Sequence, residues 1–477
     1  GAPRRIGMVK LHEPEARLKA LNRIFRPRSV AVIGASSTPG KIGYAIVENL
    51  KNGGYEGNIY PVNPKAEEIL GFRCYKGLQE IEGDIDVVLV AIPAAMVPSI
   101  IPDAGAKGVA GLVIISSGFA EIGEHELQKQ ITDLAQAHDV RIMGPNIYGY
   151  YYTPMNLCAT FCTPYSERGQ VALVSQSGGV GMAILGFSRS RGMGVSAIVG
   201  LGNKCDIDED DLLEFFGADP NTQVIAIHME DIKDGPGFLE TAQRVSKTKP
   251  IVVLKAGRTE AGARAAASHT GALAGADGVY DAAFKQAGVI RASTLEELLD
   301  WAWALQTLPE PKGEDAIIIT GAGGLGVLLT DACVQHGVKL LSMPLDLDEA
   351  YKKLIPPFGA SGNPIDITGG EPPETYKNAI LLGLRDPRVH SLILGYWHTI
   401  ITPPLVFADL VSDALDEAEK EGIVKPVVAA LAGDIEVEEA TTRLRKRGVV
   451  AYPYAGEKAV AALGVKYRVW RNRDSNH

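Results

Sequence analysis

The sequence predicts an α/β protein made of three doubly wound domains. Two observations point to this class. Short apolar runs alternate with helical patterns along the chain, and glycine-rich turns follow several of these runs. At about 150 residues per domain, a chain of 477 residues corresponds to roughly three domains. We expect them at residues 15–150, 151–308 and 314–470.

The apolar runs have the character of parallel strands covered on both faces, because their hydrophobic residues are continuous rather than alternating. Two segments with turn or linker composition, 154–169 and 307–313, are expected to join the domains. In chain order, the expected strands are 29–33, 57–62, 86–91, 111–115 and 141–143, then 170–174, 194–199, 223–228 and 250–254, and finally 315–320, 391–394 and 426–430.

Composition excludes several classes of protein. The formal net charge of −10 and the pI near 5.5 argue against nucleic acid as the main partner. No apolar run reaches the roughly 18 residues of a membrane-spanning helix. No signal peptide is visible, so we expect a cytoplasmic protein that does not enter the membrane. The five cysteines are scattered and lack the paired spacing of a zinc site, so no bound metal is expected.

In the first domain, a glycine-rich turn leads from the run 29–33 into a helical pattern. Such a turn presents backbone N–H groups and a helix N-terminus to a phosphate. The next strand ends near Asn63 and Lys65, where NAD-binding folds usually carry an acidic residue for the ribose. An amide and a cation suit a phosphorylated ribose, which coenzyme A has at its 3′ position, with NADP as the alternative. The expected coenzyme A site comprises Gly34, Ala35, Ser36, Lys41, Asn63, Lys65, Ile92, Pro93, Ser116 and Gly118.

Similar turns follow the runs 170–174 and 315–320. Helix N-termini without a nearby basic side chain suit a small dianion held by backbone dipoles, and phosphate fits that description. Each turn, like the one in the first domain, has tight packing as its alternative role. The expected phosphate contacts are Ser175, Gln176, Ser177, Gly178, Gly179, Gly323 and Gly324.

A histidine among small residues, His269 in the segment 267–275, is the candidate nucleophile. Small and polar segments of this kind are typical of functional loops, and an exposed loop with an incidental histidine is the alternative. Glu230 follows the run 223–228 and would fix the tautomer of His269, unless it is only a solvated acid. The acidic residues between Asp206 and Asp211 predict the solvated first turn of a helix rather than a metal site.

Taken together, the motifs resemble those of the α subunits of ADP-forming acetyl-CoA synthetases. These proteins belong to the acyl-CoA synthetase (NDP-forming) superfamily, which includes succinyl-CoA synthetase. The resemblance covers residues 18–470. The motifs that carry it are Ser29-Val-Ala-Val-Ile-Gly-Ala-Ser36, Gly144-Pro-Asn146, Val174-Ser-Gln-Ser-Gly-Gly179, Gly202-Asn-Lys204, Glu230, Ser268-His-Thr-Gly271, Thr320-Gly-Ala-Gly-Gly324 and Asn363-Pro-Ile-Asp-Ile-Thr-Gly369.

The resemblance implies a Rossmann-like CoA-binding domain followed by two flavodoxin-like domains. It implies that phosphate converts acyl-CoA to acyl phosphate and CoA, that His269 takes the phosphoryl group, and that the phosphohistidine then moves to phosphorylate ADP. Glu230 corresponds to the acid that holds the histidine. The nucleotide and its Mg²⁺ would belong to an ATP-grasp β subunit on a separate chain, in an assembly expected to be α2β2.

The resemblance leaves the acyl group open. Acetyl is the group that the family implies, but members often continue Gly-Pro-Asn with Cys, whereas this chain has Ile147 and Tyr148. We expect Asn146 and Tyr148 at the acyl pocket. Alternative functions are a regulatory subunit that senses acyl-CoA without turnover, an NADP-dependent oxidoreductase and a protein acetyltransferase. The retained His269 and Glu230 argue against the first alternative, and the extra glycine-rich turns argue against the second.

Overall fold

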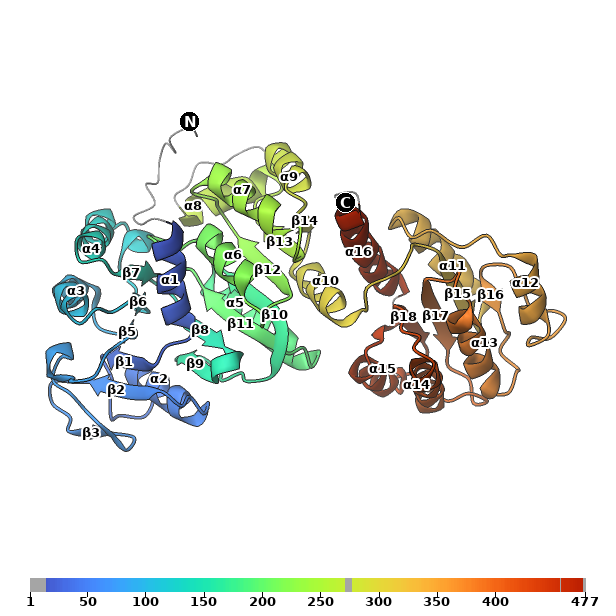
Figure 1. Ribbon diagram of the computed structural model, residues 1–477, viewed down its shortest axis with the longest axis horizontal. Helices are drawn as coiled ribbons and strands as arrows, with labels where there is room; N and C mark the ends of the chain where they lie inside the picture. The colour runs from blue at the N-terminus through green and yellow to red at the C-terminus, as the bar shows by residue number, and fades with distance from the viewer. Residues whose placement is uncertain (1–13, 271–276, 455, 475–477) are drawn as a thin grey trace. The chain divides into compact units, whose positions relative to one another are not determined.

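The computed structural model describes residues 14–270, 277–454 and 456–474. Contacts divide the chain into two compact units, Gly1–Ala302 and Trp303–His477 (Figure 1). In the described residues, the first unit contains a five-stranded and a seven-stranded sheet, and the second contains a five-stranded sheet. The predicted α/β class is therefore confirmed, and every strand expected from the sequence forms.

The first sheet is parallel and has the strand order β2-β1-β5-β6-β7. Helices α1 and α2 pack on one face, where Leu21 and Ile46 join the core. Helices α3 and α4 pack on the other face, through Ile101 and Ile131. The elements are α1 (Pro14–Phe25), β1 (Ser29–Ile33), α2 (Ile42–Asn52), β2 (Asn58–Val62), β5 (Val87–Val90), α3 (Val97–Ala106), β6 (Gly111–Ile114), α4 (His125–Ala137) and β7 (Arg141–Met143), with a small hairpin of β3 (Glu68–Ile69) and β4 (Phe72–Arg73).

The second sheet has the order β14-β13-β12-β10-β11-β8-β9. Five of its strands run parallel, whereas β8 and β9 form an antiparallel hairpin at one edge. The elements are β8 (Gly149–Tyr152), β9 (Leu157–Thr160), β10 (Arg168–Ser175), α5 (Gly178–Ser190), β11 (Val195–Gly200), α6 (Glu209–Ala218), β12 (Val224–Met229), α7 (Gly235–Val245), β13 (Ile251–Lys255), α8 (Glu260–Thr270), α9 (Asp277–Gln286), β14 (Ile290–Ala292) and α10 (Leu295–Thr307).

Within residues 154–169, which were expected to join two domains, β9 forms and pairs with β8 at the edge of the second sheet. Three tyrosines of β8 are fully buried, namely Tyr150, Tyr151 and Tyr152. The ring of Tyr150 packs edge-to-face on the ring of Phe25, with 5.4 Å between the ring centroids. Aromatic residues favour strands because they fill a packed sheet surface. The two sheets of the first unit consequently share one hydrophobic core.

The second unit contains a parallel sheet of order β16-β15-β17-β18-β19. Its short edge strands, β16 and β19, were not expected from the sequence. The elements are β15 (Ala316–Thr320), α11 (Gly323–Gln335), α12 (Leu345–Lys352), β16 (Ile365–Asp366), α13 (Glu374–Arg385), β17 (Ser391–Trp397), α14 (Pro404–Lys420), β18 (Val427–Ala432), α15 (Val437–Lys446), β19 (Val450–Pro453) and α16 (Gly456–Asp474). Short 3-10 helices in the first unit are η1 (Leu78–Glu80), η2 (Ala94–Met96), η3 (Ala120–Ile122) and η4 (Thr153–Met155).

The acidic run begins a helix as expected, but it is not solvated. Asp206 and the residues from Asp208 to Asp211 are all at most 6% exposed. Asp208 and Asp211 form a capping box at the start of α6. Arg141 pairs with Asp206 at 2.9 Å and with Asp211 at 3.1 Å, so one buried cation compensates both of these carboxylates.

Neither a membrane span nor a metal cluster occurs in the residues that the structure describes. None of the helices there is long and apolar enough to cross a bilayer. In the same residues, no group of three or more His, Cys, Asp or Glu side chains is placed to hold a metal ion.

Candidate functional site

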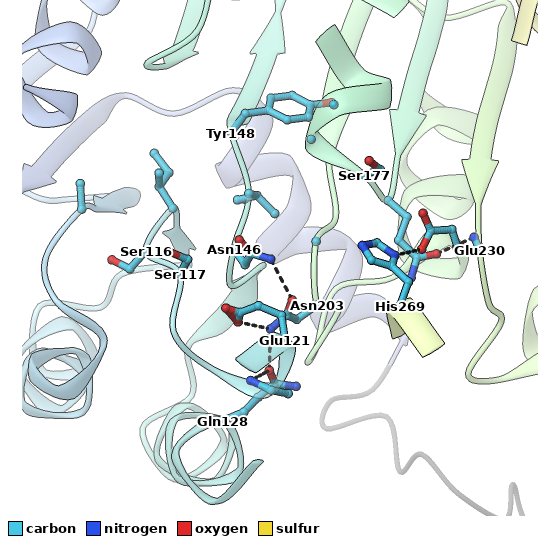
Figure 2. A pocket seen from close by; sticks show the side chains of 18 of the residues that line it. Ser116, Ser117, Glu121, Gln128, Asn146, Tyr148, Ser177, Asn203, Glu230 and His269 are labelled. Carbon is cyan, nitrogen blue, oxygen red and sulfur yellow. Dashed lines mark hydrogen bonds and ion pairs between the residues drawn. The ribbon is translucent and has the colours of Figure 1, made fainter. Parts of the chain in front are cut away.

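A cavity of about 1070 Å³ lies between the two sheets of the first unit (Figure 2). Both sheets contribute residues from the carboxyl ends of their strands, which is where ligands bind in open α/β folds. Ile92, Pro93 and Ser116 line it from the first sheet. Figure 2 shows Glu230 and His269 on the opposite side, contributed by the second sheet and its helices.

The glycine-rich turn of the first sheet is tightly packed. Gly34 has a φ of +88°, and a Cβ there would lie 2.2 Å from the carbonyl oxygen of Ala91. A Cβ on Gly43 would lie 1.8 Å from the carbonyl oxygen of Gly34. Only glycine allows α2 to approach β1 and β5 so closely. At these two positions, the packing role holds whether or not a ligand binds nearby.

Asn63 organises the same turn from the end of β2. Its Nδ2 donates to the carbonyl oxygen of Ala35 at 2.8 Å, and its Oδ1 accepts from the backbone N–H of Lys65 at 2.8 Å. The side chains of Lys41 and Lys65 are exposed. Their binding of CoA phosphates stays a prediction, since these residues lie outside the cavity lining, as do Gly34, Ala35, Ser36, Asn63 and Gly118.

The turn between β10 and α5 is more open. Ser177 is the N-cap of α5 and accepts a hydrogen bond from Val180 N–H at 3.4 Å. Ser175 is buried, and its hydroxyl donates to the carbonyl oxygen of Ser177 at 2.7 Å. Ser177, Gly178 and Gly179 line the cavity, where a first helical turn leaves N–H groups that need partners. Among the described residues, nothing lies within 4 Å of the Cβ position of Gly179.

His269 and Glu230 are in direct contact, as the sequence predicted. Nδ1 of His269 hydrogen-bonds to Oε2 of Glu230. Because a carboxylate only accepts, Nδ1 carries the proton, and in the neutral ring Nε2 then has the lone pair that a nucleophile needs. The His269 side chain is 68% exposed, whereas that of Glu230 is 13% exposed. Glu230 is therefore the fixed partner, and His269 is the accessible one.

One expectation about His269 is wrong. It does not lie in a loop but in the last turn of α8, because the alanine-rich stretch before it has high helix propensity. The remainder of the expected loop, residues 271–275, lies outside the described residues.

Further polar residues lie in or beside the cavity, of which the sequence singled out only Asn203, as part of the motif Gly202-Asn-Lys204. Asn203 donates to Glu121 at 3.0 Å and to Gln128 at 2.9 Å, which joins the second sheet to the first (Figure 2). Lys233 donates to the carbonyl oxygen of Asn203 at 2.7 Å, and burial lowers the pKa of its ammonium group. His228 is buried beside Ser175, and burial lowers its pKa. Lys233 follows a strand and His228 lies within one, and many structural residues share these positions, so the sequence pattern alone does not mark them.

Asn146 and Tyr148 both line the cavity. Asn146 has a φ of +66° and donates to Oδ1 of Asn203 at 3.4 Å. The Tyr148 ring is 4% exposed and packs against α5, where a Cβ on Gly181 would lie 2.4 Å from the ring. Its hydroxyl has no hydrogen-bond partner among the described residues, and burial raises its pKa.

Gly323 and Gly324 belong to the second unit, where they begin α11. A Cβ on Gly323 would lie 3.2 Å from a carboxylate oxygen of Asp366. Their role as phosphate contacts stays a prediction.

Family models match nearly the whole chain in three consecutive segments. A CoA binding domain matches residues 28–153, a succinyl-CoA ligase like flavodoxin domain matches 168–305, and a ligase-CoA domain matches 316–475. These matches agree with the three α/β sheets and with the strand-end cavity of the first unit. The class of protein is therefore that of the CoA ligases related to succinyl-CoA ligase.

Full-length relatives narrow this class. The chain is 47% identical over 464 residues to the acetate–CoA ligase [ADP-forming] I subunit alpha of Pyrococcus furiosus, covering 96% of this chain and 99% of that one. It is 42% identical to the acetate–CoA ligase [ADP-forming] of Methanocaldococcus jannaschii, but covers only 64% of that protein. The chain belongs to the family of the alpha subunits of ADP-forming acetate–CoA ligases.

A solved structure agrees with this placement. The dinucleotide forming acetyl-coenzyme A synthetase 1 of Ca. Korarchaeum cryptofilum, in complex with phosphate and ADP, superimposes with a TM-score of 0.92 at 43% identity. The match covers 95% of this chain and 97% of that chain.

Proposed function

We propose that this chain is the α subunit of an ADP-forming acetyl-CoA synthetase. The reaction converts acetyl-CoA, phosphate and ADP to acetate, CoA and ATP. The observation that carries the proposal is the contact between His269 and Glu230 at a cavity that the CoA-binding domain also lines. A histidine with a fixed tautomer and an accessible second nitrogen is suited to accept a phosphoryl group.

The first step proposed is attack of a phosphate oxygen on the thioester carbonyl carbon. The C–S bond breaks, CoA leaves as its thiolate, and acetyl phosphate forms. Ser177, Gly178 and Gly179 are positioned to bind the phosphate, because the first turn of α5 presents N–H groups and the positive end of the helix dipole. Such preorganised donors stabilise the charge that develops on transferring groups.

The second step is attack of Nε2 of His269 on phosphorus. The P–O bond to the acyl group breaks, acetate leaves, and the imidazole becomes a phosphohistidine. Glu230 accepts the hydrogen bond from Nδ1–H and stabilises the positive charge that the ring acquires. The phosphoryl group then passes to ADP, and Nδ1 of His269 keeps its proton throughout.

We assign the ADP site and its Mg²⁺ to a separate ATP-grasp β subunit in an α2β2 assembly. Two comparisons support a partner. The Pyrococcus relative is named a subunit alpha, and the Methanocaldococcus relative extends well beyond the part that this chain matches. Gly323 and Gly324 would form a second phosphate contact for the phosphohistidine at the start of α11.

We assign the acyl pocket to Asn146 and Tyr148. The Nδ2 of Asn146 lies at the cavity between Ser116 and His269 in Figure 2, where it can donate to the thioester carbonyl oxygen. The buried Tyr148 ring closes the cavity beside the first turn of α5, so it limits the length of the acyl group.

The test is mass spectrometry of the chain after incubation with phosphate and a panel of acyl-CoAs, with and without the partner subunit. We expect one acid-labile phosphoryl group on His269, formed most rapidly with acetyl-CoA. Absence of this adduct from the complete assembly, under conditions where CoA binds, would contradict the proposal.

A further inference from the structure

Gln176 directs its side chain at the backbone that carries Glu230. It is the first residue after β10, and its Oε1 accepts hydrogen bonds from the backbone N–H of Glu230 at 2.8 Å and of Asp231 at 3.3 Å. Its Nε2 donates to Oδ1 of Asp231 at 2.5 Å. Both ends of this amide are therefore used by the protein itself, although Gln176 lines the cavity and was expected to contact phosphate.

A buried cation binds the same carboxylate oxygen of Asp231 that accepts from Gln176. Lys204 is fully buried, with Nζ 3.0 Å from Oδ1 of Asp231 and 2.8 Å from Oε1 of Glu209. Nζ also donates to the carbonyl oxygen of Asp231 at 2.9 Å. Burial acts to raise the pKa of Asp231, but the Lys204 charge and the hydrogen bond from Gln176 lower it overall. Asp231 thus stays ionised and fixed in place.

These contacts leave Glu230 little freedom. The side-chain amide of Gln176 binds the backbone N–H of Glu230 and that of Asp231. With its backbone held in this way, Glu230 can adjust its contact with His269 only by rotating its side chain. If the Glu230 carboxylate were displaced, the imidazole of His269 would no longer be held in one tautomer and one orientation. Groups that orient a reacting side chain affect the reaction rate strongly.

We propose that Gln176 is a positioning residue, which the Lys204–Asp231 pair holds in place and which fixes Glu230 against His269 rather than binding phosphate. This inference rests on the proposed phosphohistidine function. The inference predicts different behaviour for glutamine and glutamate at position 176. Glutamate has the same shape and would keep an oxygen that accepts from the two N–H groups, but its other oxygen would face the carboxylate of Asp231. Two carboxylates sharing one contact repel.

The structure offers a test in which donor and acceptor exchange places. Gln176→Glu breaks the contact with Asp231, whereas Asp231→Asn, added to it, supplies an amide donor opposite the new acceptor. The matched control is Gln136→Glu, on an exposed position of α4. Each variant is assembled with the partner subunit, and the rate of phosphohistidine formation is measured by rapid quench over a range of phosphate concentrations.

We expect Gln176→Glu to lower the maximal phosphorylation rate by about 10- to 100-fold, in the range seen for groups that orient a functional side chain, with the KM for phosphate unchanged within twofold. The double variant should recover at least about tenfold of that loss, and the control should match the wild type. Gln176→Met, which adds no charge, should lower the rate in the same way if the glutamate variant fails to fold.

Two outcomes would overturn this inference. A raised KM for phosphate with an unchanged maximal rate would make Gln176 a phosphate ligand. If the double variant forms phosphohistidine no faster than Gln176→Glu alone, the contact between Gln176 and Asp231 does not position Glu230. A wild-type assembly that forms no phosphohistidine would instead reject the proposed function, so the two failures are distinguishable.

Discussion

The two glycine-rich turns of the first unit have the same appearance in the sequence and different roles in the structure. In the turn after β1, Gly34 and Gly43 are enclosed by backbone atoms, and Asn63 ties the loop from a neighbouring strand. In the turn after β10, Gly179 faces open space and Ser177 caps the helix at the cavity. A strand followed by a glycine-rich turn and a helix therefore predicts that something approaches the backbone of the turn closely. The pattern does not tell whether that neighbour is another part of the protein or a ligand.

The largest expected effect concerns His269, which lies in α8 on the same side of the cavity as the open turn. His269→Asn removes the nucleophile, so the rate of ATP formation should fall by at least about 10⁴-fold, as removal of a nucleophile does in other enzymes. Binding of CoA, which we propose to involve the packed turn, should be unchanged, as measured by calorimetry. Wild-type turnover in this variant would show that the two turns do not divide the work in this way.

Glu230→Gln is expected to have the next largest effect. The amide can present its NH₂ group to Nδ1 and allow the other tautomer, so phosphohistidine formation should slow by about 10²- to 10⁴-fold. Rapid quench on the assembled enzyme measures this rate. An unchanged rate would mean that the exposed histidine needs no fixed partner, and CoA affinity serves as the internal control.

Alanine substitutions contrast the two turns directly. Gly43→Ala places a methyl group against the carbonyl oxygen of Gly34, so the free energy of unfolding should fall by about 3 kcal/mol. Gly179→Ala adds a methyl group in open space, so stability should stay within about 0.5 kcal/mol. Denaturant unfolding measures both, and similar losses would contradict the distinction between a packed and an open turn.

Tyr148, which packs on the helix that follows the open turn, tests the proposed acyl pocket. Tyr148→Ala should raise the preference for a longer acyl-CoA over acetyl-CoA by about 10- to 100-fold in kcat/KM, the range that small differences in an apolar pocket produce. Tyr148→Phe is the matched control, because it keeps the ring and removes a hydroxyl that has no partner among the described residues. Equal changes for all acyl groups would exclude the ring from the acyl pocket.

The smallest expected effect lies at the packed turn. Lys65 is exposed, so its contact with the 3′-phosphate of CoA would be worth at most about 1 kcal/mol, or about fivefold in affinity. Lys65→Ala should weaken CoA by that factor and leave dephospho-CoA unaffected, as measured by isothermal titration. Equal weakening of both ligands would reject the assignment.

Local patterns predicted most of the fold and the centre of the candidate site. The twelve expected strands all form, because buried parallel strands carry a continuous apolar signal. The contact between His269 and Glu230 could be predicted, since each has a distinctive context. The β8–β9 hairpin could not, because two of its tyrosines, Tyr150 and Tyr152, are buried against Phe25 of a distant helix. The same holds for the pairing of Lys204 with Asp231, which depends on two strand ends meeting.

The core shared by the two sheets of the first unit has a consequence for modularity. The CoA binding and flavodoxin family models end and begin at residues 153 and 168, which suggests a place to cut. The fold does not divide there, since Phe25 packs on Tyr150 and Tyr152, and Arg26 pairs with Asp219 at 2.7 Å. Separating the two sheets would expose apolar core surface on both, so we expect neither to fold well without the other. We therefore expect the two sheets to be transferable between proteins only as one piece.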